Sequence, residues 1–321
     1  MYYAISHLTL YKYSHPISDS VMEIRMQPRS DGNQRVIRFD VNVSPDTRIF
    51  STRDYLGNTI HNFNIPALHE SLAIKAEAVV ELKEPAPLPD ALPLSAWDAI
   101  DARSHDRDLY DLLLAGQYTQ STPLLKQFEQ EVQWQRSNDP LSLVKELNTT
   151  IYNAFSYQSG VTRADSPIDV ALQSRSGVCQ DFTHIMLTML RNLGIPARYV
   201  SGYLFHRVEE NDRSDEDASH AWLEAWLPEL GWVGFDPTNN LIVGDRHIRV
   251  NVSNDYAAAS PSRGIFTGDA STELEVRVKV SQLQELPYEH VELTPDMPMP
   301  RYSYYQAPQQ TQQQQQQQQQ Q

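Results

Sequence analysis

The first 84 residues alternate apolar and polar side chains, and this alternation limits the fold more than any other feature of the chain. In SLAIKAEAVVEL (71–82) and QRVIRFDVNV (34–43), every second residue over most of the stretch is apolar. A period of two places those residues on one face of a half-buried strand. Together with the hairpin signal at Gly57-Asn58, the pattern predicts a small antiparallel β-sandwich over residues 1–84.

Composition limits the kind of protein. The 321 residues are 40% hydrophobic, which is enough for a substantial core and suggests roughly two domains. The chain carries 41 acidic against 26 basic residues, a formal charge of −15, which disfavours nucleic acid and anionic membranes as partners. We find no signal-peptide pattern and no run near the ~20 apolar residues of a membrane span. With a single cysteine, we expect a protein of the reducing cytoplasm.

Proline marks the boundary of the first domain. The stretch PAPLPDALP is typical of an extended connector, so we place a linker at residues 85–95. Helical patterns follow, and the alternating stretch ELEVRVKVSQL predicts one more strand near the end of a second domain over residues 96–285. The remaining residues, 286–321, are rich in proline, tyrosine and glutamine, which predicts a disordered tail.

Cys179, the only cysteine, lies at the start of an amphipathic helix. Apolar residues recur at helical spacing from Phe182 to Leu193, and Gly194 follows as a C-terminal cap. We expect Ser176 to be the N-cap, which places Cys179 in the first turn, where backbone N–H groups and the helix dipole favour a thiolate. One cysteine cannot form an internal disulfide or a structural zinc site. It is therefore either a nucleophile or a packed small side chain.

A nucleophile needs a base, and the segment SHAWLEAWLPELGWVGFDPTNN supplies a candidate. As two strands joined by a turn, the segment puts His220 and Asp236 on the same face. An antiparallel register with Glu224 opposite Trp232 places His220 directly opposite Asp236, with Cβ atoms ~5 Å apart. The carboxylate can then orient the imidazole, and the neighbouring helix can bring the thiol. Glu224 shares the face of His220 and is a further candidate.

Each of these features also has an ordinary structural interpretation. The chain has 10 histidines, and an aspartate before proline, such as Asp236, can simply open a turn. We expect His184 to be structural and Asp181 to stabilise the helix N-terminus. The ring of Trp222 either lines a cleft or packs in the core. The acidic run 209–217 is typical of a solvated loop.

Three stretches resemble the core of the bacterial transglutaminase-like family: GVCQDFTHIMLTMLRNLGIPARYVSGYL, ASHAWLEAWLPELGWVGFDPTNN and HIRVNVSNDYAAASPSRG. YAISHLTLYKYSHPI, MEIRMQPRSDGNQRV and DYLGNTIHNF resemble that family's N-terminal β-rich domain. The resemblance implies a papain-like α+β fold, with the nucleophile helix packed on an antiparallel sheet. It implies a triad of Cys179 as nucleophile, His220 as general base and acid, and Asp236 as orienter. The implied chemistry is attack on an amide or other acyl carbon, a thioester acyl-enzyme, and release to water or an amine.

The backbone N–H of Cys179 is a natural donor to an oxyanion. The resemblance implies a second donor from the indole of an upstream tryptophan, and the nearest one, Trp134, lies in a predicted helix. Gln173, six residues before Cys179, has the spacing of the glutamine donor of papain-like proteases. Gln173 is therefore our candidate for the oxyanion hole, and Trp222, named above, is our candidate for the cleft.

We predict a cysteine peptidase or amidase that hydrolyses a peptide or amide, because water is always present and no amine site is recognisable in the sequence. Protein-glutamine cross-linking is the first alternative. A peptide-binding scaffold without catalysis is the second. The sequence indicates no metal site and no cofactor, and it does not predict the oligomeric state.

Overall fold

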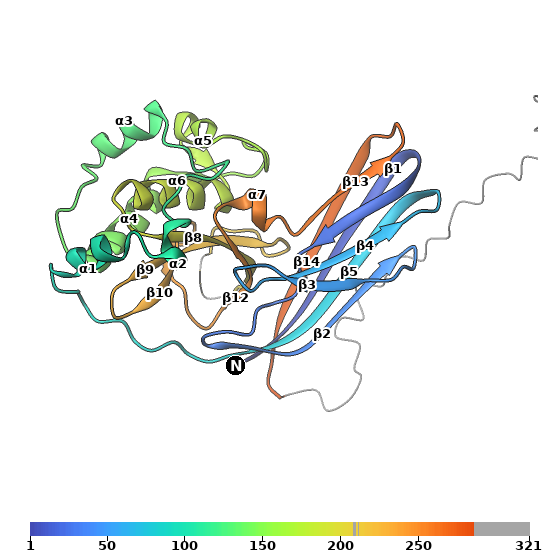
Figure 1. The fold of residues 1–321 in the computed structure, drawn as a ribbon, viewed down its shortest axis with the longest axis horizontal. Coiled ribbons are helices and arrows are strands. Elements are labelled where there is room, and N and C mark those ends of the chain that lie inside the picture. Colours follow the sequence, from blue (N-terminus) through green and yellow to red (C-terminus); the bar gives the residue numbers. More distant parts are fainter. Residues whose placement is uncertain (208–209, 211, 286–321) are drawn as a thin grey trace, which may run out of the picture.

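The computed structural model describes residues 1–207, 210 and 212–285. The predicted tail over residues 286–321 therefore lies outside the described residues. Two lobes lie side by side: long strands build one, and helices over a smaller sheet build the other (Figure 1). Among the described residues, we find no helix long and apolar enough to cross a membrane.

The N-terminal lobe is a curled antiparallel sheet organised around one long strand, β1. Its strands are β1 (Tyr2–Ile24), β2 (Gln34–Ser44), β3 (Phe50–Arg53), β4 (Thr59–Ile65), β5 (His69–Leu82), β13 (Ser262–Thr267) and β14 (Thr272–Leu283). The first half of β1 pairs with β5 and β14, and its second half pairs with β4 and β13. Buried apolar residues such as Ile17, Phe63 and Leu72 form one core in this lobe. The predicted β-sandwich-like domain is thus a single sheet curled around its own core.

The end of the described chain returns to the N-terminal lobe. The stretch ELEVRVKVSQL forms most of β14, which confirms the predicted strand, but β13 and β14 pair with β1. The structure therefore corrects the C-terminal boundary of the second domain, which the sequence placed at residue 285. Alternation shows that a segment is a strand, and it does not show which sheet the strand joins.

The second lobe packs helices on a five-stranded antiparallel sheet of order β11-β10-β9-β8-β12. The strands are β8 (Ala197–Leu204), β9 (His220–Leu227), β10 (Gly231–Asp236), β11 (Leu241–Ile242) and β12 (His247–Ser253), and β6 (Ser156–Tyr157) and β7 (Ser176–Gly177) form a short parallel pair. The helices are α1 (Ala96–Arg103), α2 (Arg107–Tyr110), α3 (Pro123–Glu131), α4 (Pro140–Ala154), α5 (Ile168–Ser174), α6 (Cys179–Asn192) and α7 (Tyr256–Ala259). The apolar face of α6 shares one core with Ala221, Leu223 and Ala225 of β9. This arrangement is the α+β class that the sequence predicted.

Local residue chemistry fixes the ends of the main helices. The side chain of Thr122 accepts a hydrogen bond from the backbone N–H of Leu125 at the start of α3, and Asp139 caps α4 in the same manner. Each capping residue precedes a proline, which suits the first helical position because its missing N–H has no partner there. Gly194, with φ of +84°, follows the end of α6 in the conformation that glycine adopts most easily.

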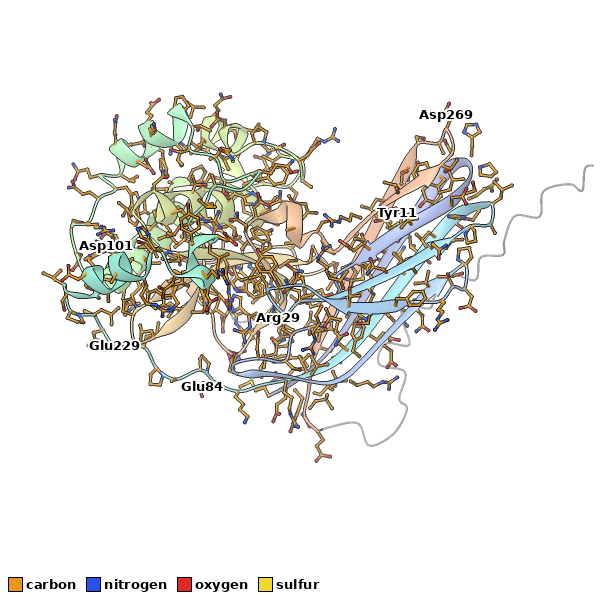
Figure 2. The ribbon with its side chains drawn as sticks, in the orientation of Figure 1. Tyr11, Arg29, Glu84, Asp101, Glu229 and Asp269 are labelled. Carbon is orange, nitrogen blue, oxygen red and sulfur yellow. The ribbon has the colours of Figure 1, made fainter. Side chains whose placement is uncertain are left out.

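Two amide side chains of the N-terminal lobe complete the edge of the second sheet at β12. Gln34 donates to the carbonyl oxygen of Arg249 and accepts from its N–H, each at 2.8 Å. Asn58 makes the same two bonds with Val252, at 2.8 and 2.9 Å. Arg29, which lies at the junction of the lobes (Figure 2), adds a backbone bond to Arg249. The amides satisfy edge groups that a further strand would otherwise pair.

Candidate active site

Cys179 is the first residue of α6, so its predicted place in the first helical turn is confirmed. The N-cap is Val178, and not Ser176 as predicted, because Ser176 is extended and pairs with Ser156 in the β6–β7 bridge. Asp181 Oδ2 accepts a hydrogen bond from the N–H of Val178 at 2.8 Å. This bond is one half of a capping box and gives Asp181 the helix-stabilising role expected of it. The Cys179 side chain is half-buried.

His220 and Asp236 meet at the end of the sheet where β9 begins and β10 ends. Nε2 of His220 donates a hydrogen bond to Oδ2 of Asp236 at 2.8 Å, and the side chains are 2% and 0% exposed. A buried pair of this kind is held in one geometry because each partner satisfies the other. The predicted contact between histidine and carboxylate is therefore present in the structure.

The register of β9 and β10 differs from the prediction by two residues. Glu224 faces Gly234, and not Trp232. The predicted register leaves only Pro228 between the facing residues, and a hairpin needs at least two residues in its loop. The turn instead runs from Pro228 to Leu230. A shift of two keeps each side chain on its own face of the sheet, which is why the histidine and the aspartate still meet.

Asp236 is fully hydrogen-bonded despite its burial. Its Oδ1 accepts the backbone N–H groups of Thr238 and Asn239, at 3.0 and 3.2 Å. Its Oδ2 accepts the Asn239 side-chain amide at 2.9 Å and Nε2 of His247 at 3.2 Å, besides His220. Burial raises the pKa of Asp236, but the positive charge of His220 and the hydrogen bonds of both histidines outweigh it and hold that pKa well below its usual range.

The surroundings of His220 favour its protonated form. Burial lowers the pKa of His220, but the charge and hydrogen bond of Asp236, and then the Cys179 thiol, outweigh burial and raise the pKa to about 10. Nδ1 of His220 is buried and has no aligned hydrogen-bond partner among the described residues. Because Nε2 is engaged with Asp236, Nδ1 is the nitrogen free to take the thiol proton. The structure thus brings Cys179, His220 and Asp236 together.

Trp222 packs in the core beside the site. Its side chain is fully buried and forms an apolar cluster with Val200 and Val252. The ring centroid lies 5.9 Å from that of His220 and 5.2 Å from that of His247. Of the two interpretations left open by the sequence, the core is therefore the one observed. Trp222 therefore packs against both histidine rings.

Neither Gln173 nor the upstream Trp134 is joined to the thiol by a hydrogen bond of the described residues. Gln173 lies in α5 with an exposed side chain. The indole N–H of Trp134 donates to the carbonyl oxygen of Met189 in α6 at 2.9 Å. This N–H is therefore already engaged and does not point to an oxyanion. His184, also on α6, is buried and accepts the backbone N–H of Tyr256 at 3.2 Å, which fits its expected structural role. The role of Gln173 stays a prediction.

The acidic run is more constrained than the predicted solvated loop. Of residues 209–217, the structure describes 210 and 212–217. Asp212 pairs at 2.7 Å with Arg246, whose side chain is buried. Asp215 accepts the hydroxyl of Tyr157 at 3.1 Å. Burial, and then the neighbouring Cys179 thiol, raise the pKa of Tyr157. The run is therefore tied to the side of the site where the thiol lies.

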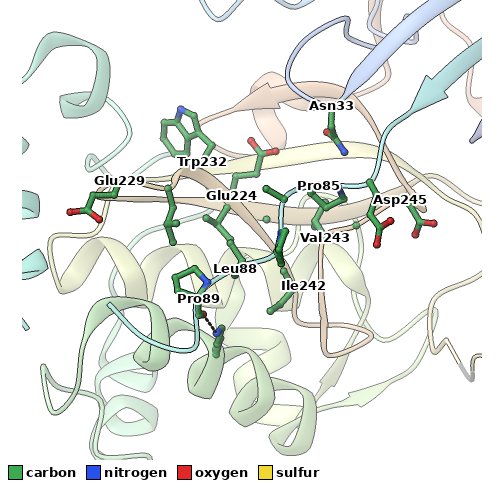
Figure 3. Close-up of a pocket in the computed structure, with 18 of the residues that line it drawn as sticks. Asn33, Pro85, Leu88, Pro89, Glu224, Glu229, Trp232, Ile242, Val243 and Asp245 are labelled. Atoms are coloured by element: carbon green, nitrogen blue, oxygen red, sulfur yellow. Dashed lines mark hydrogen bonds between the residues drawn. The ribbon is translucent and has the colours of Figure 1, made fainter. Parts of the chain in front are cut away.

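Glu224, the remaining candidate, belongs to a different feature of the sheet. A cavity of about 680 Å³ lies between residues 84–90 and the strands β9 and β10, and Glu224 and Trp232 line it (Figure 3). Glu224 is buried and pairs with Arg198 at 2.6 Å and with Arg249 at 3.1 Å. None of the three predicted catalytic residues lines this cavity. Glu224 therefore contributes to an ion cluster apart from the thiol.

His220, Asp236 and His247 also have the composition of a metal site. Each offers one ligand atom, and these atoms lie within 4.8 Å of one another. Zinc is bound by such nitrogen and oxygen atoms. In this structure the same atoms hydrogen-bond to one another, with both imidazoles directed at one carboxylate oxygen. The arrangement observed is that of a hydrogen-bonded cluster.

A thiol at a helix start, beside a histidine–carboxylate pair on an antiparallel sheet, defines the papain-like transglutaminase class. Residues 126–237 match the model of the transglutaminase-like superfamily, and residues 3–81 match that of the bacterial transglutaminase-like N-terminal region. An uncharacterized protein of Mycobacterium leprae is 31% identical over 280 residues, which cover 87% of this chain and 98% of that protein. The chain therefore belongs to the bacterial transglutaminase-like family.

A solved structure and a further protein are also similar to this chain. A crystal structure from Cytophaga hutchinsonii, of a protein named as a candidate cysteine protease, matches with a TM-score of 0.68 and 22% identity over 91% of this chain and 94% of that one. It shows the same fold in both lobes. A protein-glutamine gamma-glutamyltransferase of Pseudomonas aeruginosa is 35% identical over 97 residues, 26% of this chain and 13% of that protein.

Proposed function

We propose that the protein catalyses thiol-dependent acyl transfer from an amide, with Cys179 as nucleophile, His220 as base and acid, and Asp236 as orienter. The buried 2.8 Å bond between His220 and Asp236, beside the only thiol of the chain, carries this proposal. His220 takes the thiol proton, and the thiolate attacks the acyl carbon. His220 then returns the proton to the leaving amine as the C–N bond breaks, which leaves a thioester on Cys179.

We propose hydrolysis as the second half-reaction. His220 removes a proton from water, the hydroxide attacks the thioester, and the carboxylic acid product leaves as the thiol is regenerated. Water is the acceptor unless a site excludes it or binds an amine in its place. Cross-linking by amine transfer is the second candidate, favoured by the 97-residue match to a protein-glutamine gamma-glutamyltransferase.

A peptide or protein is the proposed substrate. The formal charge of −15 gives no support to a polyanionic partner such as nucleic acid or an anionic membrane surface. We propose the cytoplasm as the compartment, because a reducing environment keeps a single catalytic thiol free of disulfide adducts.

Intact-mass analysis during turnover tests the proposal and separates the two acceptors. The wild type and Cys179→Ala are incubated with a panel of glutamine-containing peptides and simple amides, with and without a primary amine. Hydrolysis predicts a carboxylic acid product whose yield is insensitive to the amine, and an acyl mass on the wild type alone. An amine adduct as the main product would favour cross-linking. If the wild type and Cys179→Ala give the same product yields and neither carries an acyl mass across the panel, the proposal is contradicted and the binding scaffold is favoured.

A further inference from the structure

Asp236 holds two imidazoles, and the proposed reaction uses only one of them. Oδ2 of Asp236 accepts Nε2 of His220 at 2.8 Å and Nε2 of His247 at 3.2 Å. His247 is the first residue of β12, and its side chain is 2% exposed. The two rings lie 6.2 Å apart, and the indole of Trp222 contacts both. His247 is thus part of the same packed unit as the proposed base.

The hydrogen bonds define the protonation of His247. A carboxylate only accepts, so Nε2 of His247 carries a hydrogen. Nδ1 is buried and has no partner in the described part of the chain. A cationic ring would bury an unpaired N–H and would add a positive charge beside His220 and Arg246. Burial lowers the pKa of His247 more than Asp236 raises it. His247 is therefore a neutral donor.

A neutral donor suits this place better than a cation. The carboxylate of Asp236 must keep its negative charge available to the imidazolium that forms on His220. A second positive charge on the same oxygen would compete for that charge and disfavour protonation of His220. A neutral N–H instead fixes the position of Oδ2 without adding charge. Removing it would leave Oδ2 with the bonds from His220 and Asn239 only.

We propose that His247 is a positioning residue, whose neutral Nε2–H holds Oδ2 of Asp236 so that the carboxylate orients His220 toward Cys179. The proposal rests on the function proposed above, because it assigns His247 a part in the same proton transfer. The hydrogen bond that His247 makes among the described residues goes to Asp236, and not to the thiol. Its effect passes through Asp236.

Three variants test this role. His247→Leu removes the donor, and we expect kcat to fall about 10- to 100-fold with KM within about twofold, because a hydrogen bond to a charged group is lost. His247→Gln keeps an N–H donor and should recover kcat to within about fivefold of the wild type. The control is His69→Leu, which removes a buried histidine of the N-terminal lobe that bonds Ser20 at 2.9 Å. That control should leave kcat unchanged.

Wild-type kcat in His247→Leu, or a glutamine variant as slow as the leucine variant, would overturn the proposal. If the leucine variant does not fold, ¹⁵N-histidine NMR of the wild type decides. The proposal predicts a neutral His247 with its hydrogen on Nε2 at pH 7, and an Nδ1–H tautomer or a cation would contradict it. A wild type without thiol-dependent turnover would instead defeat the proposed function, while the NMR result would still test the predicted hydrogen bond.

Discussion

Two buried carboxylates lie on neighbouring strands of one sheet, and their partners differ in kind. Glu224 on β9 is 1% exposed and pairs with the guanidinium groups of Arg198 and Arg249. Asp236 on β10 is 0% exposed and pairs with two imidazoles. Guanidinium groups stay protonated in proteins, so the Glu224 cluster holds its charges fixed. An imidazole can accept and return a proton, so the Asp236 cluster can take part in proton transfer.

The comparison teaches that a perturbed carboxylate alone does not mark a catalytic site. Burial raises the pKa of both Glu224 and Asp236, but their cationic neighbours lower it by more, so both pKa values end below the usual range. What separates the two clusters is the identity of the neighbours and the thiol beyond His220. The following predictions test this separation, from the largest expected effect to the smallest.

Removal of the nucleophile should have the largest effect. We expect Cys179→Ala to lose about 10⁴-fold or more of kcat, because no other described group replaces the thiol. The side chain is small and half-buried, so thermal unfolding should shift little. Turnover of a chromogenic amide, measured beside circular dichroism, checks both points. If the variant fails to fold, Cys179 is a packing residue and the proposed mechanism loses its nucleophile.

Neutralising Asp236 should have the next largest effect. Asp236→Asn removes the charge that raises the pKa of His220, and we expect kcat to fall about 10³- to 10⁴-fold, as for other orienting carboxylates. The thiol should remain accessible, which alkylation at high pH can verify. Turnover equal to that of the wild type would remove Asp236 from the mechanism and erase the distinction from Glu224.

Neutralising Glu224 should affect stability and spare catalysis. Glu224→Gln removes a buried carboxylate from two partly buried guanidinium groups that share it, and we expect the free energy of unfolding to fall by about 3–5 kcal/mol. The kcat of the folded variant should match that of the wild type. Urea unfolding measures the loss, with Glu229→Gln, an exposed position near the same cavity (Figure 3), as the control without effect. A folded Glu224→Gln protein with lost activity would contradict the comparison.

The pH dependence of stability should separate the two clusters further. The pKa of His220 rises from 6.5 to about 10 in the folded protein, so its pairing with Asp236 stabilises fully below pH 6.5. That stabilisation is lost as pH rises toward about 10. The stability advantage of the wild type over Asp236→Asn should therefore shrink between pH 6 and 10. Its advantage over Glu224→Gln should stay level, because arginine does not titrate there.

Urea unfolding of the three proteins at pH 6, 8 and 10 gives both differences. If neither stability advantage changes with pH, His220 is not held as a cation by Asp236. If both stability advantages shrink as pH rises, the whole sheet loses stability at high pH, and the pH dependence does not distinguish the two clusters.

Local patterns predicted much of the site. The helix that begins at Cys179 and ends before Gly194 was readable, because apolar spacing and a C-terminal glycine act within one segment. Side chains along a strand alternate between the two faces of the sheet, so a register shift of two residues keeps each one on its own face. His220 and Asp236 therefore share a face in either register. The match of these motifs to a known family supplied the same three residues.

Features that depend on the spatial order of the strands could not be read from the sequence. His247 reaches Asp236 because β12 lies beside β8 at the edge of the sheet, an order that alternation does not encode. The return of residues 262–283 to the N-terminal lobe has the same cause. The register of β9 and β10 was wrong for a local reason, since the minimum loop length of a hairpin would have excluded it.

Alkylation of Cys179 as a function of pH, read by intact mass, tests the central claim most directly. The chain has one cysteine, so each added label reports on that thiol. We predict fast labelling that persists well below pH ~8.5, the ordinary thiol value, and that weakens in His220→Ala. Slow labelling along an ordinary thiol curve, unchanged by His220→Ala, would show that the thiol is not paired with the histidine and would contradict the proposed mechanism.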